Sequence, residues 1–192
     1  MVSVTKLRRS LLLYEYLIIS RGGQGGVTAS RLLATAAVLE GKYAQAIPEF
    51  GAERRGAIVR SYLRLSDQPI KRHSAVRNPQ GVAVFSSRIL ELIDIRKYVP
   101  EGATIVVNSS SPPSLSGYRV YYVDATSIAL RLGLVIAGWP VVNTAMAAAM
   151  ARVFNIASLE SLQKAMEEYF RGKLLEVNRE AARLAWDSVR GV

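Results

Sequence analysis

The chain has 192 residues, of which 50% are hydrophobic and 21% charged, so it is long and apolar enough to fold around a core. It contains no cysteine, which excludes disulfides, zinc–thiolate sites and iron–sulfur clusters bound in the usual way. The formal net charge of +10 fits an acidic partner or an anionic ligand. We do not expect nucleic acid as a partner, because the basic residues are scattered and no nucleic-acid-reading motif occurs.

Two stretches have some character of a targeting or membrane segment. Residues 6–19 begin with Lys6 and continue with an apolar run, but Glu15 interrupts the run and no small-residue cleavage site follows. Residues 132–151 carry no charge over about the length that spans a bilayer. Glycines, Pro140 and Asn143 break up this second stretch, so two buried segments meeting at Pro140 are the better interpretation. We therefore expect no signal peptide, no membrane contact and a cytoplasmic protein.

A glycine-rich loop follows the first predicted strand, at residues 12–19, and precedes a predicted helix at residues 27–40. This loop consists of Arg21, Gly22, Gly23, Gln24, Gly25 and Gly26. Such a layout is typical of a phosphate-binding turn, because glycines let backbone N–H groups approach a phosphate and the helix N-terminus carries partial positive charge. The strict G-x-G-x-x-G pattern is broken, because Ser20 takes its first position. A plain strand-to-helix turn is the alternative interpretation.

Strand and helix patterns alternate through the rest of the chain. Residues 57–66 alternate between two faces and are expected to form a half-exposed strand, with Arg60 and Arg64 on the same face. Pro140 is predicted at the first position of a helix, and Ser158 is predicted to cap another. The remaining elements are strands at 43–47, 82–85, 104–108 and 118–124, and helices at 88–98, 125–133 and 174–189.

This alternation predicts an α/β fold: a doubly wound, mostly parallel sheet with helices on both faces and a helical C-terminal part. No internal repeat or linker is visible, so residues 1–192 are expected to form a single domain.

Several short motifs also occur together in a fixed order. They are the glycine loop with Val27-Thr28-Ala29, then Pro48-Glu49-Phe50-Gly51, Glu53-Arg54-Arg55-Gly56, Arg64-Leu65-Ser66-Asp67 and Pro140-Val141-Val142-Asn143-Thr144-Ala145-Met146. In order and spacing they resemble the gamma subunit of 2-oxoacid:ferredoxin oxidoreductases, of the pyruvate or 2-oxoisovalerate type, over nearly the whole chain. In that family the complex decarboxylates a 2-oxoacid oxidatively on thiamine diphosphate, passes electrons through iron–sulfur clusters to ferredoxin and releases acyl-CoA.

The resemblance implies a non-redox subunit that lies near the CoA and thiamine sites, with alpha, beta and delta-type subunits as partners. The residues agree with this division, because the chain has neither cysteines for clusters nor the Gly-Asp-Gly segment that thiamine diphosphate usually needs. We therefore expect no catalytic residue, no metal site and no cofactor bound by this chain alone. CoA, thiamine diphosphate with Mg and the clusters are expected to belong to the assembled complex.

The resemblance also suggests ligand-binding residues, each with a simpler alternative. The glycine loop from Arg21 to Gly26, with Thr28, is expected to bind an anion. Arg54 and Arg55 are placed near CoA phosphates, although adjacent arginines are usually a solvated pair. Asn143 and Thr144 are placed near the cofactors, although they can simply start a helix.

Other residues and functions are considered beside these. Glu49, roughly where a ribose-binding acid would lie, is expected to be an ordinary loop carboxylate, and His73 a surface residue. The departures from the family pattern are Ser20 for glycine, Gln80 for aspartate, Val84-Phe85-Ser86 for an apolar-acidic strand end, and Ala147-Ala148-Ala149 for Leu-Gly-Ala. Alternative functions are a free-standing dinucleotide-binding module, a basic nucleic-acid-binding protein, and a gamma-like subunit of an indolepyruvate or 2-oxoglutarate oxidoreductase.

Overall fold

The structure is a computed structural model that describes residues 13–49, 56–72 and 74–192. Arg54, Arg55 and His73 lie outside the described residues, so the expectations for these three side chains stay predictions. No helix in the described ranges is long and apolar enough to cross a membrane.

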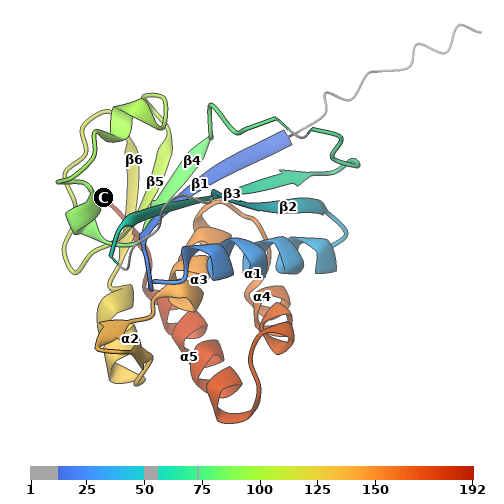
Figure 1. Cartoon of the computed structure of the whole chain (residues 1–192), viewed down its shortest axis with the longest axis vertical. Coiled ribbons are helices and arrows are strands. Elements are labelled where there is room, and N and C mark those ends of the chain that lie inside the picture. Colours follow the sequence, from blue (N-terminus) through green and yellow to red (C-terminus); the bar gives the residue numbers. More distant parts are fainter. Residues whose placement is uncertain (1–12, 50–55, 73) are drawn as a thin grey trace, which may run out of the picture.

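A seven-stranded mixed sheet forms the centre of the fold, with the strand order β2-β3-β1-β4-β5-β6-β9 (Figure 1). Strands β1, β4, β5 and β6 pair in parallel, whereas β3 and β9 run against their neighbours. The strands are β1 (Leu13–Arg21), β2 (Tyr43–Pro48), β3 (Ile58–Ser66), β4 (Gly81–Val84), β5 (Thr104–Asn108), β6 (Arg119–Val123) and β9 (Arg190–Gly191). This confirms the predicted mostly parallel α/β sheet.

The α-helices gather on one face of this sheet, below it in the view of Figure 1. They are α1 (Gly26–Leu39), α2 (Ala125–Arg131), α3 (Asn143–Val153), α4 (Leu159–Ala165) and α5 (Gly172–Ser188), with the 3-10 helix η3 (Met166–Glu168) after α4. Helix α3 is buried from Asn143 to Ala151, and its run of alanines lets it pack closely against α1 and α5. The alanines that replace the family's Leu-Gly-Ala stretch therefore lie at the centre of the core.

The opposite face is covered by short 3-10 helices, η1 (Ser87–Ile89) and η2 (Ile95–Lys97), whose Ile89 and Ile95 pack onto the sheet. The predicted helix at 88–98 is therefore wrong. Asp94 has an extended backbone and accepts a hydrogen bond from the N–H of Arg96, so it caps a new turn instead of continuing the first one.

The prediction for Pro140 is also wrong. Pro140 ends a small hairpin made of β7 (Val135–Ile136) and β8 (Trp139–Pro140), and α3 starts three residues later. The hairpin turn consists of Ala137 and Gly138, both with positive φ, which is the backbone that a two-residue turn requires. Since Ile136 and Trp139 are exposed, this part of the chain is not the buried segment that was expected.

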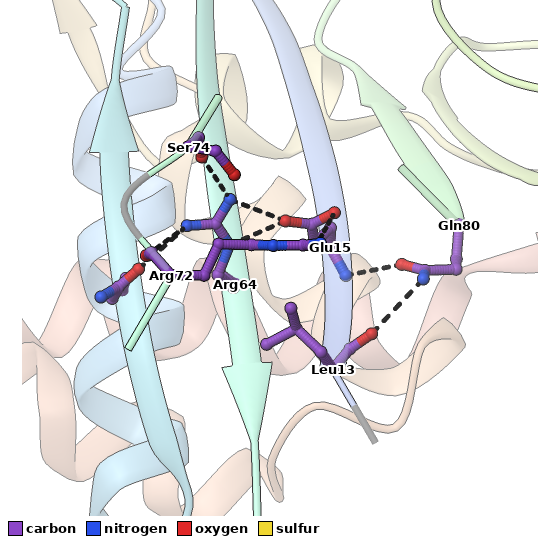
Figure 2. Close-up of polar contacts among 7 residues, drawn as sticks. Leu13, Glu15, Arg64, Arg72, Ser74 and Gln80 are labelled. Atoms are coloured by element: carbon purple, nitrogen blue, oxygen red, sulfur yellow. Dashed lines mark hydrogen bonds and ion pairs between the residues drawn. The ribbon is translucent and has the colours of Figure 1, made fainter. Parts of the chain in front are cut away.

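The alternating strand β3 is buried more deeply than expected, because Arg64 lies in the interior. Figure 2 shows its guanidinium against Glu15, which is the register partner of Arg64 on β1. The Nη2 atom of Arg64 lies 2.7 Å from Oε1 of Glu15, and the side chains are 1% and 9% exposed. Arg64 also donates to the carbonyls of Arg72 and Ser74, so the connection between β3 and β4 covers this end of the sheet.

Candidate functional site

The glycine loop joins the carboxyl end of β1 to the N-terminus of α1, as the sequence predicted. Gly25 is the residue before the helix and has φ 80°, and Gly23 has φ 99°. These left-handed conformations are strained for residues with a side chain. The backbone of Gly22 is already engaged, since its N–H donates to the carbonyl of Ala57 at 2.9 Å.

Close packing explains the last two glycines of the loop. A Cβ atom on Gly26 would lie 2.4 Å from Oγ of Ser20, and one on Gly25 would lie 2.8 Å from Cβ of Asn143. Ser20 is buried, so the serine that departs from the family pattern fills the space that Gly26 leaves open. Close packing therefore accounts for glycine at positions 25 and 26. The loop is open at Gly23, where an added Cβ meets nothing within 4 Å.

Gln24 shapes the loop from within. Its Oε1 accepts the N–H of Arg21 at 2.8 Å, and its Nε2 donates to the carbonyl of Phe85 at 3.1 Å. Both ends of the buried amide are thus used to tie the loop to the end of β4. Its side chain therefore supports the conformation of the loop.

The N-terminus of α1 has the properties of an anion site. Among the described residues no side chain caps this helix, and its first turn contains no acidic residue. The first N–H groups of an α-helix have no partner within the helix, and the helix dipole adds partial positive charge there. An anion beside Gly26 and Val27 would satisfy these N–H groups.

The residues at this N-terminus line a pocket of about 530 Å³, a volume in the range of small-molecule sites. One wall is the loop with Arg21, Thr28 and the N-terminus of α1, and the other is mostly apolar. The second wall includes Leu134, Val135, Ile136, Val141, Phe170 and Leu174. We call this space the glycine-loop pocket. It can accept a ligand with an anionic part and an apolar or uncharged part.

Asn143 and Thr144 turn out to have different roles. Asn143 lines the glycine-loop pocket beside Gly25. Thr144 is fully buried and is not part of the pocket wall; its hydroxyl lies 2.9 Å from Oδ1 of Asn178. Asn178 reaches the pocket from α5 and donates through Nδ2 to the carbonyl of Leu174. Thr144 therefore orients a pocket residue that the sequence analysis did not identify.

Arg21 carries an unusual atom. Its Nε is the single buried side-chain nitrogen or oxygen in the described ranges that has no hydrogen-bond partner. Since buried polar groups are nearly always satisfied, such an atom needs an explanation, and a bound ligand is one. No carboxylate of the described residues lies within ion-pair distance of Arg21. The guanidinium borders the glycine-loop pocket and a neighbouring one.

Glu49 is engaged in a cluster of its own. Its Oε1 lies 2.7 Å from Nη2 of Arg60, and its Oε2 accepts the hydroxyl of Tyr62 at 3.0 Å. Burial raises the pKa of Tyr62 to about 12, and the hydrogen bond to the carboxylate adds to that rise. Both carboxylate oxygens of Glu49 are thus engaged with side chains of β3, and its expected role as an ordinary loop carboxylate stays a prediction. No group of three or more metal-ligating side chains gathers anywhere in the described part.

The sequence analysis did not identify the residues that form the second wall of the glycine-loop pocket. Asn178, Phe170 and Leu174 belong to the C-terminal helical part, and Ile136 to the hairpin. They reach the loop only because α3 and α5 pack side by side beneath the sheet (Figure 1). Gly56, which follows Arg54 and Arg55 in the sequence, donates its N–H to the carbonyl of Gly22 at 3.4 Å.

Comparison with known proteins agrees with this fold. The sequence model described as pyruvate ferredoxin/flavodoxin oxidoreductase matches residues 15–188. Pyruvate synthase subunit PorC of Methanothermobacter thermautotrophicus is 41% identical over 169 residues, which cover 88% of this chain and 92% of that protein. The common gamma subunit of the pyruvate/ketoisovalerate oxidoreductases of Thermococcus litoralis is 38% identical over 174 residues, covering 87% and 92%.

A solved structure is similar over the same range. Pyruvate oxidoreductase subunit PORC of Thermotoga maritima matches with a TM-score of 0.78 and 33% identity, covering 93% of this chain and 98% of that one. These matches confirm the resemblance inferred from the glycine loop and the later motifs. The chain therefore belongs to the pyruvate ferredoxin/flavodoxin oxidoreductase family, as one of its gamma (PorC-type) subunits.

Proposed function

We propose that this gamma subunit serves a complex that oxidises pyruvate or a related 2-oxoacid, and that its glycine-loop pocket binds coenzyme A there. The names of the relatives support the reaction class. The chain has no cysteine and the described part has no metal-ligand cluster, which suits a subunit that binds while others react. Alpha, beta and delta-type partners then hold thiamine diphosphate with Mg and the iron–sulfur clusters that reduce ferredoxin.

The observation that carries the CoA proposal is the uncapped N-terminus of α1 facing a pocket beside the unpartnered Nε of Arg21. A diphosphate group would satisfy both the helix N–H groups and the guanidinium. The apolar second wall suits the uncharged pantetheine arm, which must reach a partner to meet the acyl group. Arg54 and Arg55 remain proposed phosphate ligands, since Gly56 next to them contacts Gly22.

A charge placed at Gly23 tests this proposal. An added Cβ at Gly23 has open space, and Asn and Asp are the residues that best tolerate left-handed backbone. Gly23→Asp and Gly23→Asn then differ mainly in one negative charge. Across about 5 Å, that charge opposes a phosphate by roughly 1–3 kcal/mol, depending on solvent exposure. In the assembled complex, Gly23→Asp should raise the KM for CoA about tenfold over Gly23→Asn.

The control is Gly41→Asp, because Gly41 also has positive φ and open space but lies beyond the C-terminus of the same helix. It should leave the CoA dependence unchanged. All three variants should still reduce the clusters when the 2-oxoacid is added without CoA, because decarboxylation takes place in a partner. An equal KM for CoA in the Asp and Asn variants of Gly23 would refute the proposed pocket.

A further inference from the structure

A second pocket, of about 500 Å³, lies beside the glycine loop at the carboxyl ends of the parallel strands. We call it the serine pocket and define it by Ser86, Ser87, Arg88, Ser109, Ser110 and Trp139. Residues 86–88 follow β4, residues 109 and 110 follow β5, and Trp139 comes from the hairpin. Arg21 at the end of β1 also lines it, so one guanidinium borders both pockets.

The charges in the serine pocket favour an anion. Arg21 and Arg88 are its cationic residues, and neither has a carboxylate within ion-pair distance among the described residues. The one carboxylate in the wall is that of Asp124, and Ser127 occupies both of its oxygens, through the backbone N–H at 2.9 Å and the hydroxyl at 2.7 Å. The unsatisfied Nε of Arg21, which also supports the glycine-loop pocket, belongs to a guanidinium that borders this second pocket as well.

The hydroxyl groups and the aromatic ring narrow the class of anion. The hydroxyls of Ser86 and Ser87 make no hydrogen bond within the part of the chain that the structure describes, so both are free to donate. Hydroxyls combined with guanidinium groups are typical donors to phosphate oxygens. Trp139 is 42% exposed in the same wall, and an exposed indole face is a stacking platform for a nucleobase.

We propose that the serine pocket binds the 3′-phosphorylated adenosine end of CoA, with its phosphate on Arg21, Arg88, Ser86 and Ser87 and its adenine against Trp139. This inference rests on the proposed function, in which the diphosphate lies at the glycine loop. Arg21, between the pockets, then contacts both phosphorylated parts. The position agrees with the general rule that ligands of α/β sheets bind at the carboxyl ends of strands where the chain reverses its direction of winding, here between β1 and β4.

Direct binding of a nucleotide fragment is the first test. The chain has two tryptophans, so Trp186→Phe leaves Trp139 as the single reporter. Titration with adenosine 3′,5′-bisphosphate should quench its fluorescence, and inorganic phosphate in excess should compete. Adding Arg88→Ala should weaken binding about three- to tenfold, since a partly exposed charge-assisted contact is lost. Arg119→Ala removes another exposed arginine, at the opposite end of the strands, and should have no effect.

The assembled complex provides the second test, through the ratio of the KM values for dephospho-CoA and CoA. Arg88→Ala should lower this ratio about three- to tenfold by raising the KM for CoA alone, because dephospho-CoA lacks the 3′-phosphate. Bisphosphate binding with an unchanged ratio would assign the pocket to a separate nucleotide and overturn the CoA assignment. Absence of Trp139 quenching would overturn the phosphate site itself. If Gly23→Asp fails to affect CoA while bisphosphate binding still depends on Arg88, the proposed function falls and the phosphate site stands.

Discussion

Arg64→Met should destabilise the protein strongly, because it leaves Glu15 buried without its partner. Arg64 donates from Nε to Oε1 of Glu15 at 2.7 Å, and from Nη1 to the side chain of Gln45 at 3.2 Å and the carbonyl of Arg72 at 2.9 Å (Figure 2). Its Nη2 donates to the carbonyl of Ser74 at 2.7 Å. Breaking a buried ion pair by removing one partner typically costs about 3–5 kcal/mol.

The lower end of that range is the better expectation for this site. The side chain of Arg72 lies 3.8 Å from Oε2 of Glu15 and is 55% exposed, so it can move closer and compensate part of the charge. Residues 72 and 74 are exposed, and water can replace the donors that their carbonyls lose. We therefore expect a loss of about 3 kcal/mol in the free energy of unfolding, measured by urea denaturation and seen as a lower midpoint.

Two further variants make this reasoning refutable. Glu15→Leu combined with Arg64→Met removes both charges and should recover much of the loss, because an apolar pair of similar volume is often as stable as a buried ion pair. Arg60→Met breaks the half-exposed pair with Glu49 and should cost less than about 1 kcal/mol. If Arg64→Met costs no more than Arg60→Met, or if the double variant is no better than the single one, burial of the pair does not have the energetic role argued above.

Three other outcomes are expected. The isolated chain should contain no iron by elemental analysis, since it lacks cysteine, and should not decarboxylate 2-oxoacids, since it lacks the Gly-Asp-Gly segment that thiamine diphosphate usually needs; iron near one cluster per chain or decarboxylation without partners would contradict this. Burial raises the pKa of Tyr16 to about 12, above the value near 10 in the unfolded chain, so the stability that this group contributes is complete below pH 10 and lost between pH 10 and 12. The free energy of unfolding, measured by urea denaturation at each pH, should therefore fall less steeply over that range for Tyr16→Phe than for the unchanged chain. Arg54→Ala with Arg55→Ala should raise the KM for CoA about tenfold while sparing cluster reduction by the 2-oxoacid, and a slower first half-reaction with unchanged CoA dependence would assign the pair to subunit docking.

Much of the fold could be predicted because its strands and helices have strong local patterns. The apolar strand β1 and the helix α1 begin and end within about two residues of the expected positions. The face of Arg64 could not be predicted, because an alternating strand reads the same whether its polar face meets water or a buried carboxylate. The predictions for the segment around Asp94 and for the hairpin before Asn143 were wrong for a related reason. Short-range sequence patterns do not show where tertiary contacts end a helix.

The candidate site also contains residues that could be predicted from the sequence and residues that could not. Glycine, with its freedom at positive φ, marks the loop in the sequence, and four of its residues reach the glycine-loop pocket beside Arg21 and Thr28. Asn178 carries no such mark, since its link to Thr144 spans 34 residues and exists only after α3 and α5 have packed. The hydrogen bonds of Gln24 and Thr144 to other parts of the protein were likewise not visible in the motif, and the ligand-binding roles expected for these two residues stay predictions.

These inward contacts make the glycine loop rigid, and a rigid loop favours the anion binding proposed for it. Gln24 ties it to the end of β4, Gly22 ties it to the start of β3, and Ser20 and Asn143 leave no room for side chains on Gly26 and Gly25. A loop held on these sides loses little conformational freedom when an anion binds, so more of the interaction energy remains as affinity. Within this rigid frame, Arg21 has no carboxylate partner among the described residues, and it lies at the strand where the winding of the sheet reverses. A ligand that spans both pockets would place a phosphate group on each side of the Arg21 guanidinium. For this reason we place the two phosphorylated parts of CoA around Arg21.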